Sequence, residues 1–184
     1  MTIGLLYTYH IEIGPSSQML KGRLQFFQEL LHFDLQDAPL NTFVARENWP
    51  QKGTLHHEAL FASLQEGDFF KPVHSAVDLT RFFMLEYKLP ITFHDADALT
   101  TPLMVDPKQA TVSDQLGLIS SPDTFALRTE ASETTTNGLH VFYFPNHLHE
   151  DKRLPLLQAA GNMFTHVHGG NTSIQLMESS SSDV

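Results

Sequence analysis

Two histidines lie in similar surroundings near the two ends of the chain. His10 follows the segment GLLYTY, His140 lies within GLHVFYF, and each segment precedes a Leu-rich stretch. Near the C-terminus, Gln175 stands between two apolar residues in a third segment of alternating character. Imidazole nitrogens and amide oxygens can hold a divalent metal ion or hydrogen-bond a small molecule. We therefore expect three strands to direct these side chains into one shared site.

The amino-acid composition limits which metal ligands, cofactors and partners are possible. The 184 residues include no cysteine, so a metal ion would have to bind through imidazole, carboxylate or amide groups. Acidic residues outnumber basic ones by 21 to 11 and no stretch gathers Lys and Arg, so we expect no nucleic-acid partner. The absence of a glycine-rich phosphate-binding motif predicts no nucleotide cofactor. Because no apolar run could span a bilayer, we expect a soluble, cytoplasmic protein with no membrane partner.

The elements that would position these residues form two similar strand-helix units. Apolar residues at every second position from Ile3 to Ile13 predict a long strand with His10 on its polar face. A helix is predicted after the Gly-Pro pair that follows, because its leucines and phenylalanines recur three or four positions apart. The second unit repeats this order, with a strand at residues 139–144 and a helix at about 153–160.

The segment between the two units is predicted to be mainly helical. Helices are expected at residues 54–64 and 75–88, and a short strand is expected at 91–95. Three prolines and weak periodicity in residues 98–122 favour a loop, which would cover a cavity between the units.

The C-terminal part completes the predicted sheet. It is expected to contain a strand at 124–131, a turn at Asn137 and Gly138, and a hairpin of residues 163–168 with 172–177. This order predicts an α+β fold, with an antiparallel sheet built from two strand-helix units and a helical middle insertion. Residues 1–177 are expected to form a single domain, and the serine-rich tail 178–184 is expected to be disordered.

The two units and the GGNTSIQLME ending resemble the vicinal oxygen chelate superfamily, the glyoxalase and bleomycin-resistance group. The resemblance implies paired βαβββ modules around a cavity. It also implies that His10, Glu130, His140 and Gln175 hold a divalent metal ion (Fe, Zn, Mn or Ni), with Glu130 as the catalytic residue. The family usually has a glutamate where Gln175 stands, and a neutral amide is a weaker donor to a divalent cation. A metal-free, ligand-binding relative is therefore the alternative.

A second metal-binding pattern occurs near the C-terminus. His166 and His168 would share one face of a strand, as the two imidazoles of a zinc or iron site do. Surface histidines without a metal are the alternative reading of this pair.

Two functions of different classes follow from the sequence. The first is a small-molecule binding protein, or a metal-dependent lyase, isomerase or dioxygenase, with its site between the two strand-helix units. The second is a non-catalytic adaptor domain that contacts a protein partner through the aromatic residues at 69–70 and 82–83. A homodimer is compatible with either function.

Overall fold

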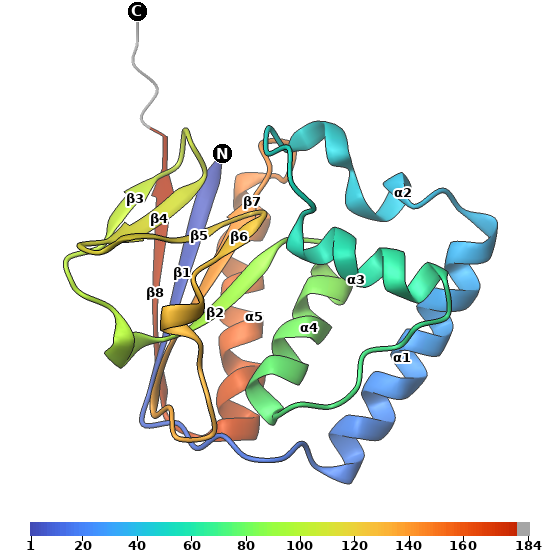
Figure 1. Ribbon diagram of the computed structural model, residues 1–184, viewed down its shortest axis with the longest axis horizontal. Helices are drawn as coiled ribbons and strands as arrows, with labels where there is room; N and C mark the ends of the chain where they lie inside the picture. Colours follow the sequence, from blue (N-terminus) through green and yellow to red (C-terminus); the bar gives the residue numbers. More distant parts are fainter. Residues whose placement is uncertain (180–184) are drawn as a thin grey trace, which may run out of the picture.

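A computed structural model describes residues 1–179 of the chain (Figure 1). The helices are α1 (Gln18–Asp37), α2 (Asn41–Val44), α3 (His56–Gln65), α4 (Ser75–Tyr87) and α5 (Glu150–His168), with the short 3-10 helices η1 (Arg46–Asn48), η2 (Ala96–Ala98) and η3 (Leu127–Thr129). The strands are β1 (Thr2–Tyr9), β2 (Ile91–Asp95), β3 (Met104–Asp106), β4 (Thr111–Asp114), β5 (Gly117–Ser121), β6 (Thr124–Phe125), β7 (Asn137–Phe144) and β8 (Asn171–Glu178).

Four antiparallel strands form the main sheet, in the order β2-β7-β1-β8. Leu6 on β1 lies opposite His140 on β7 and opposite Ile174 on β8. Successive side chains of a strand point to opposite faces, so these three residues share one face of the sheet. Leu5 and Gln175, which also pair with each other, point to the other face.

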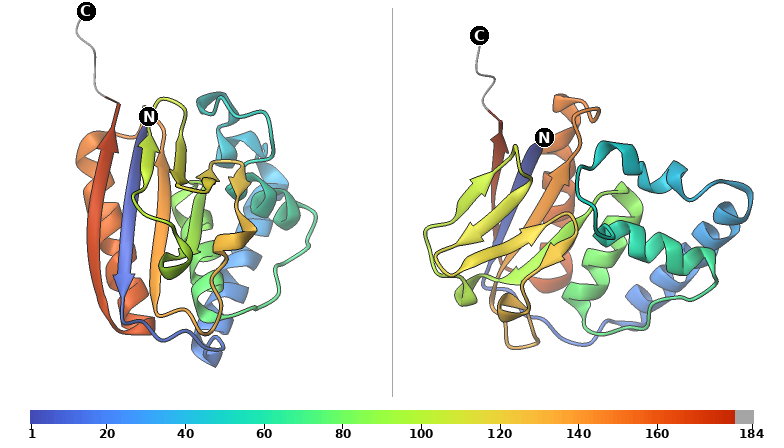
Figure 2. Two further views of the ribbon diagram at one scale, coloured as in Figure 1. Left: turned by 60° about the vertical axis from the view of Figure 1, so that its left-hand side comes forward. Right: turned by 45° about the horizontal axis from the view of Figure 1, so that its top comes forward.

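The main sheet is covered on both faces. Helices α4 and α5 pack on the face that carries Leu6, while the second sheet, in the order β3-β4-β5-β6, covers the opposite face (Figure 2). The contact with α5 is close, because a Cβ added at Gly4 of β1 would lie 2.8 Å from Leu157 Cδ1. Helix α1 lies at the edge of the molecule, where it contacts α3 (Figure 1).

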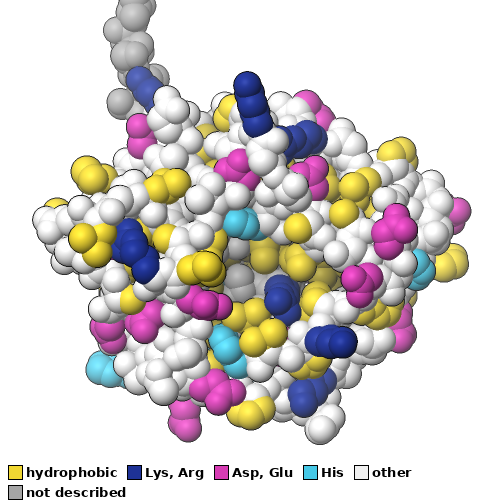
Figure 3. Space-filling model, in the orientation of Figure 1, with side chains coloured by type: hydrophobic (Ala, Val, Ile, Leu, Met, Phe, Trp, Pro, Cys, Tyr) yellow, Lys and Arg dark blue, Asp and Glu magenta, His cyan; other side chains and the backbone are white. Residues whose placement is uncertain are grey.

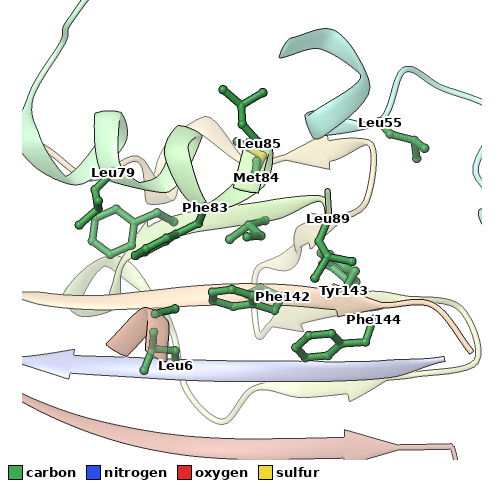
Figure 4. Close-up of a cluster of buried hydrophobic side chains, with 14 of the residues drawn as sticks. Leu6, Leu55, Leu79, Phe83, Met84, Leu85, Leu89, Phe142, Tyr143 and Phe144 are labelled. Carbon is green, nitrogen blue, oxygen red and sulfur yellow. The ribbon is translucent and has the colours of Figure 1, made fainter. Parts of the chain in front are cut away.

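The core is a continuous cluster of apolar side chains. Leu79 and Phe83 of α4 point toward β7, where Phe142 lies (Figure 4). The Phe142 ring stacks on Phe144 with 6.1 Å between ring centroids. Burial of each such side chain stabilises the fold by about 1.5 to 3 kcal/mol, so this packing holds α4 firmly against β7.

A buried chain of hydrogen bonds joins the two sheets. Tyr143 Oη donates to Ser120 Oγ at 2.6 Å, and Ser120 Oγ lies 2.6 Å from Thr92 Oγ1. Thr92 Oγ1 lies 2.8 Å from His94 Nε2, and His94 Nδ1 lies 2.7 Å from Thr129 Oγ1. Thr129 Oγ1 already donates to a backbone carbonyl, so it accepts from the Nδ1–H of His94. His94 Nε2 is then the acceptor for Thr92, and the imidazole is neutral.

The structure confirms the α+β class, the antiparallel sheet and the helical middle section. The predicted strand at 91–95 is β2, and the predicted helices at 54–64 and 75–88 are α3 and α4, with ends shifted by one or two residues. Strand β1 is shorter than predicted. Beyond Tyr9 the backbone leaves the sheet, where Ile11 N–H donates to the carbonyl of Thr136.

Other predicted elements are wrong. Residues 98–122 are not a loop but contain β3, β4 and β5, which are too short to show a clear alternation. The predicted strand at 163–168 is the last part of α5, and β8 pairs with β1 instead. The predicted strand at 124–131 ends after Phe125, and the expected turn at Asn137 and Gly138 is the start of β7.

Two remaining predictions concern the C-terminus and the membrane. Glu178, the first residue of the predicted tail, is the last residue of β8, and residues 180–184 lie outside the described part of the chain. Among residues 1–179, no helix has the length and apolar character needed to cross a membrane.

Candidate functional site

His10 lies just beyond the end of β1 and is exposed. Its φ of 57° is in the left-handed region, which is uncommon for a residue other than glycine. Its backbone N–H donates to Asn137 Oδ1 at 3.2 Å. His10 thus shapes the turn that leaves β1, and it lines neither of the two cavities described below.

His140 is completely buried on the helix-covered face of the main sheet. Its Nε2 lies 2.9 Å from Thr80 Oγ1, which donates to a backbone carbonyl and so accepts from Nε2–H. Its Nδ1 has no hydrogen-bond partner among the described residues. The ring centroids of Phe93 and Phe164 lie 4.3 and 4.8 Å from the centroid of the imidazole. Burial lowers the pKa of His140 well below its ordinary value. The histidine is therefore a neutral core residue.

Glu130 and Gln175 lie elsewhere. Glu130 is exposed and follows η3, where it forms an isolated bridge with His94 of β2. Gln175 is exposed on the edge strand β8, on the face of the sheet opposite to His140.

The structure does not bring the four predicted ligands together. As they are arranged, His10, Glu130, His140 and Gln175 do not fit one metal ion. Within residues 1–179, no group of three or more His, Asp or Glu side chains is placed to hold a metal ion. The element order also differs from two βαβββ modules, because helices follow α1. Metal binding and the family relationship stay predictions, and metal analysis of untagged protein tests the first.

Glu130 does line a small cavity between α3, α4, β2 and β6. Its volume is about 220 Å³, and its polar lining includes His56 and Arg81. Figure 3 shows a hollow on this face of the molecule, floored by hydrophobic side chains, with Lys or Arg and His side chains beside it. Ligand pockets usually occupy about 300 to 1,000 Å³, so this cavity is smaller than most of them.

A larger cavity of about 830 Å³ lies between the two strand-helix units. Its walls come from the segment that joins β1 to α1, the first turns of α1, one side of α4 and the last turn of α5. The apolar wall consists of Ile13, Pro15, Met19, Leu20, Leu24, Leu79, Phe82, Met163 and Val167. The polar groups are Glu12, Ser17, Arg23, Ser75, His166 and His168. This mixture is typical of small-molecule pockets.

Ser75 and His168 form a hydrogen-bonded pair in the wall of this cavity. Ser75 is the first residue of α4 and His168 is the last residue of α5. His168 Nδ1 lies 2.8 Å from the carbonyl of Phe164, which can only accept, so Nδ1 carries the proton. His168 Nε2 then accepts from Ser75 Oγ, 2.8 Å away. Burial lowers the pKa of His168, which favours the neutral imidazole at neutral pH and leaves Nε2 free to accept a proton.

Local hydrogen bonds hold the cavity wall in place. Gly14 N–H donates to Ser75 Oγ at 3.3 Å, and Ser75 N–H donates to the Gly14 carbonyl at 2.8 Å. Ser16 Oγ donates to the buried Asp78 carboxylate at 2.5 Å. These bonds tie the segment before α1 to the first turn of α4. The N-terminal ends of α1 and α4, which favour negative charge, thus both lie at the cavity.

The predicted pair of His166 and His168 does reach this cavity, but not as a metal chelate. Both residues belong to a helix, where side chains two positions apart diverge by about 200°. His168 is buried and bonded to Ser75, whereas His166 is exposed. The role of Ser75 could not be foreseen, because no local motif marks it and its partner lies 93 positions away.

The chain is similar to a bacterial protein along nearly its whole length. No family model matches the chain. The chain is 29% identical over 179 residues to the uncharacterized protein YhzB of Bacillus subtilis (strain 168), covering 90% of this chain and 86% of that protein. The similarity thus extends over nearly all of both chains.

Proposed function

We propose that this protein binds a small organic molecule in the cavity between α1, α4 and α5. The observation that supports the proposal most is the cavity itself, with a volume of about 830 Å³ and a largely apolar wall that polar groups interrupt at a few points. Pockets of this size and composition bury most of a ligand's surface. The cavity lies between the two strand-helix units, and none of the four residues predicted to form the site lines it.

The polar groups favour a ligand with an apolar body and an anionic head. Arg23 supplies a permanent positive charge, and the N-terminal end of α1, which has no acidic residue in its first turn, supplies partial positive charge. His166 and Ser17 add hydrogen-bond donors, whereas Glu12 is an acidic group in the lining. A carboxylate on an aliphatic or aromatic body matches this set.

Ligand-detected NMR with a library of small carboxylic acids tests the proposal. The variant Gly14→Trp should abolish binding, because Gly14 lines the cavity and nothing lies within 4 Å of a Cβ added there. The matched control is Leu127→Trp, which changes an exposed residue of η3 outside the cavity lining. Binding that Gly14→Trp leaves intact, or that Leu127→Trp abolishes equally, would contradict the proposal.

The Ser75 and His168 pair supports a second candidate function, the hydrolysis of a carboxylic ester in the same cavity. In this reaction Ser75 Oγ attacks the ester carbonyl carbon while its proton passes to His168 Nε2. His168 then gives the proton to the leaving alcohol. Water, activated by the same imidazole, hydrolyses the acyl-serine, which releases a carboxylic acid and restores Ser75.

A fluorophosphonate probe separates catalysis from binding. If Ser75 is a nucleophile, mass spectrometry should find the adduct on a peptide that contains Ser75, and His168→Gln should slow its formation. Carboxylic acids should still bind to the Ser75→Ala variant, which keeps the cavity open. Carboxylic acid binding without an adduct would refute hydrolysis and leave the binding function standing.

A further inference from the structure

Strand β8 forms an open edge of the main sheet. It pairs with β1 on one side, from Asn171 to Glu178 and without a bulge, and within residues 1–179 no strand pairs with its other side. The left view of Figure 2 shows β8 at the outer edge of the main sheet, with α5 behind it and the second sheet over the strands further inside. The outward backbone N–H and C=O groups of β8 are therefore accessible to a further strand.

This edge lacks the features that usually prevent strand pairing. Edge strands are commonly protected by a lysine, a proline or a bulge. β8 contains neither lysine nor proline, and its one charged residue, Glu178, stands at its end. The opposite edge of the main sheet differs, because β2 is only five residues long and His94 bridges it to Glu130 on its outer side. β8 is thus the edge that suits a partner strand.

The part of the molecule around β8 carries no formal charge. Residues 154–177 include no Asp, Glu, Lys or Arg, whereas 17% of the whole chain is charged. This segment forms most of α5 and nearly all of β8, which contact each other. Two copies of the chain repel each other because each has a net charge of −10. The β8 edge is therefore the surface on which a second copy meets least repulsion.

We propose that β8 pairs in antiparallel orientation with β8 of a second copy of this chain, so that the two main sheets form one continuous sheet. A two-fold axis perpendicular to the sheet at Gln175 brings the same surface of both copies together. Ile174 of one copy then lies opposite Leu176 of the other, and this pair occurs twice. Both side chains are half-buried and lie on the helix-covered face.

The pairing is self-complementary on the other face as well. Gln175 meets Gln175 of the second copy at the axis, and each amide can both donate to the other and accept from it. A charged residue at this position would instead face its own charge. Glu178 lies opposite Thr172 of the second copy, so β8 brings no like charges together.

Helix α5 fits the same two-fold axis. Leu157 of α5 lies against Gly4 of β1. One turn further on, Gly161 lies against Leu6 of β1. The axis at Gln175 therefore passes α5 about halfway between these two contacts. Because α5 packs on both β1 and β8, the two copies of α5 lie about two strand spacings, or about 10 Å, apart. This separation is normal for packed helices.

The side of α5 that faces the second copy has no charged residue. Four residues at intervals of four, four and three positions share this side: Leu154, Gln158, Asn162 and Thr165. It is opposite to the side of Met163 and Val167, which line the large cavity. Leu154 is 42% exposed, and Gln158 lies near the level of the axis. The pairing leaves the large cavity uncovered, so it does not rest on the proposed function.

Sedimentation velocity over a range of protein concentrations, at about 0.15 M salt, tests the pairing. We expect the unaltered protein to form a dimer as its concentration rises. Gln175→Glu and Gln175→Lys should each weaken the dimer about fivefold, because like charges then meet at the axis whichever sign they have. An equimolar mixture of these two variants should restore the dimer, since opposite charges then meet.

Gln115→Glu and Gln115→Lys are the matched controls, because they place the same charges on an exposed glutamine in the turn between β4 and β5. Both controls, alone or mixed, should dimerise as the unaltered protein does, and circular dichroism should show that every variant folds. A protein that is monomeric at every concentration would overturn the proposal. A dimer that both Gln175 variants leave unchanged would overturn it as well, and so would a mixture of them that associates no better than each variant alone.

Discussion

Acid should destabilise this protein because it buries several neutral histidines. His94 and His57 are fully buried, and burial lowers their pKa values to about 3 and about 4. In the unfolded chain a histidine has a pKa of about 6.5. Below that pH, the unfolded state takes up protons that the folded state does not. The free energy of unfolding therefore decreases as the pH falls from about 6.5 toward the folded-state pKa values of His94 and His57.

The size of the effect follows from these pKa values. Between about pH 7.5 and pH 5.5, linkage predicts a loss of about 1.4 kcal/mol for each of the two histidines, or about 3 kcal/mol together. Burial also lowers the pKa values of His140, His168 and His56, so the total loss should be larger. Domains of this size have free energies of unfolding of about 5 to 15 kcal/mol, so the effect is a large fraction of the total.

Urea unfolding followed by circular dichroism at the two pH values measures this loss. The variant His94→Gln should reduce the difference between the two pH values by about 1.4 kcal/mol, whatever its stability at neutral pH. The control His10→Gln replaces an exposed histidine and should leave the difference as it is in the parent. Equal free energies of unfolding at the two pH values would refute the reasoning, and so would an unchanged difference in His94→Gln.

Two further predictions concern stability at neutral pH. Thr80→Val should lower the free energy of unfolding by about 1 to 3 kcal/mol, because it leaves His140 Nε2–H buried without an acceptor. Urea denaturation measures this change, and a variant as stable as the parent would contradict the assigned hydrogen bond. Gly4→Ala should cost about 1 to 3 kcal/mol, because its Cβ would crowd Leu157, whereas Gly22→Ala on the surface of α1 should gain about 0.5 to 1 kcal/mol. Thermal denaturation compares the two glycine variants with the parent. Melting temperatures that change in the same direction in both variants would show that the packing at Gly4 is not as close as described.

Much of the fold could be predicted because its main elements show their periodicity locally. Apolar residues recur at every second position of β1, although both faces of this strand are buried, and α4 has a broad apolar face. Helix α5 extends at both ends beyond the predicted range of about 153–160, and it continues through Gly161. The structure gives a tertiary reason for that glycine, since an added Cβ would lie 3.2 Å from Leu6 Cδ1. A glycine, which has no side chain, lets α5 approach the main sheet closely at this position. No local sequence pattern reveals this contact.

The candidate site was harder to predict because it depends on pairing register and on distant contacts. His140 and Gln175 occupy similar positions in their own strands, but both strands pair with β1 in registers that place them on opposite faces. A shift of one residue in either register would reverse the face. The contact between Ser75 and His168 joins two helix ends and has no periodic signal at all.

The most direct test of the small-molecule cavity is to map ligand binding on backbone amide NMR signals during titration with a carboxylic acid from the library. We predict that the shifts concentrate on residues of the cavity wall, including Ile13, Leu20 and Val167. Shifts centred on Phe125 and Ala131 would place the ligand in the smaller cavity instead. That result, or an absence of shifts with every compound, would contradict the proposed function.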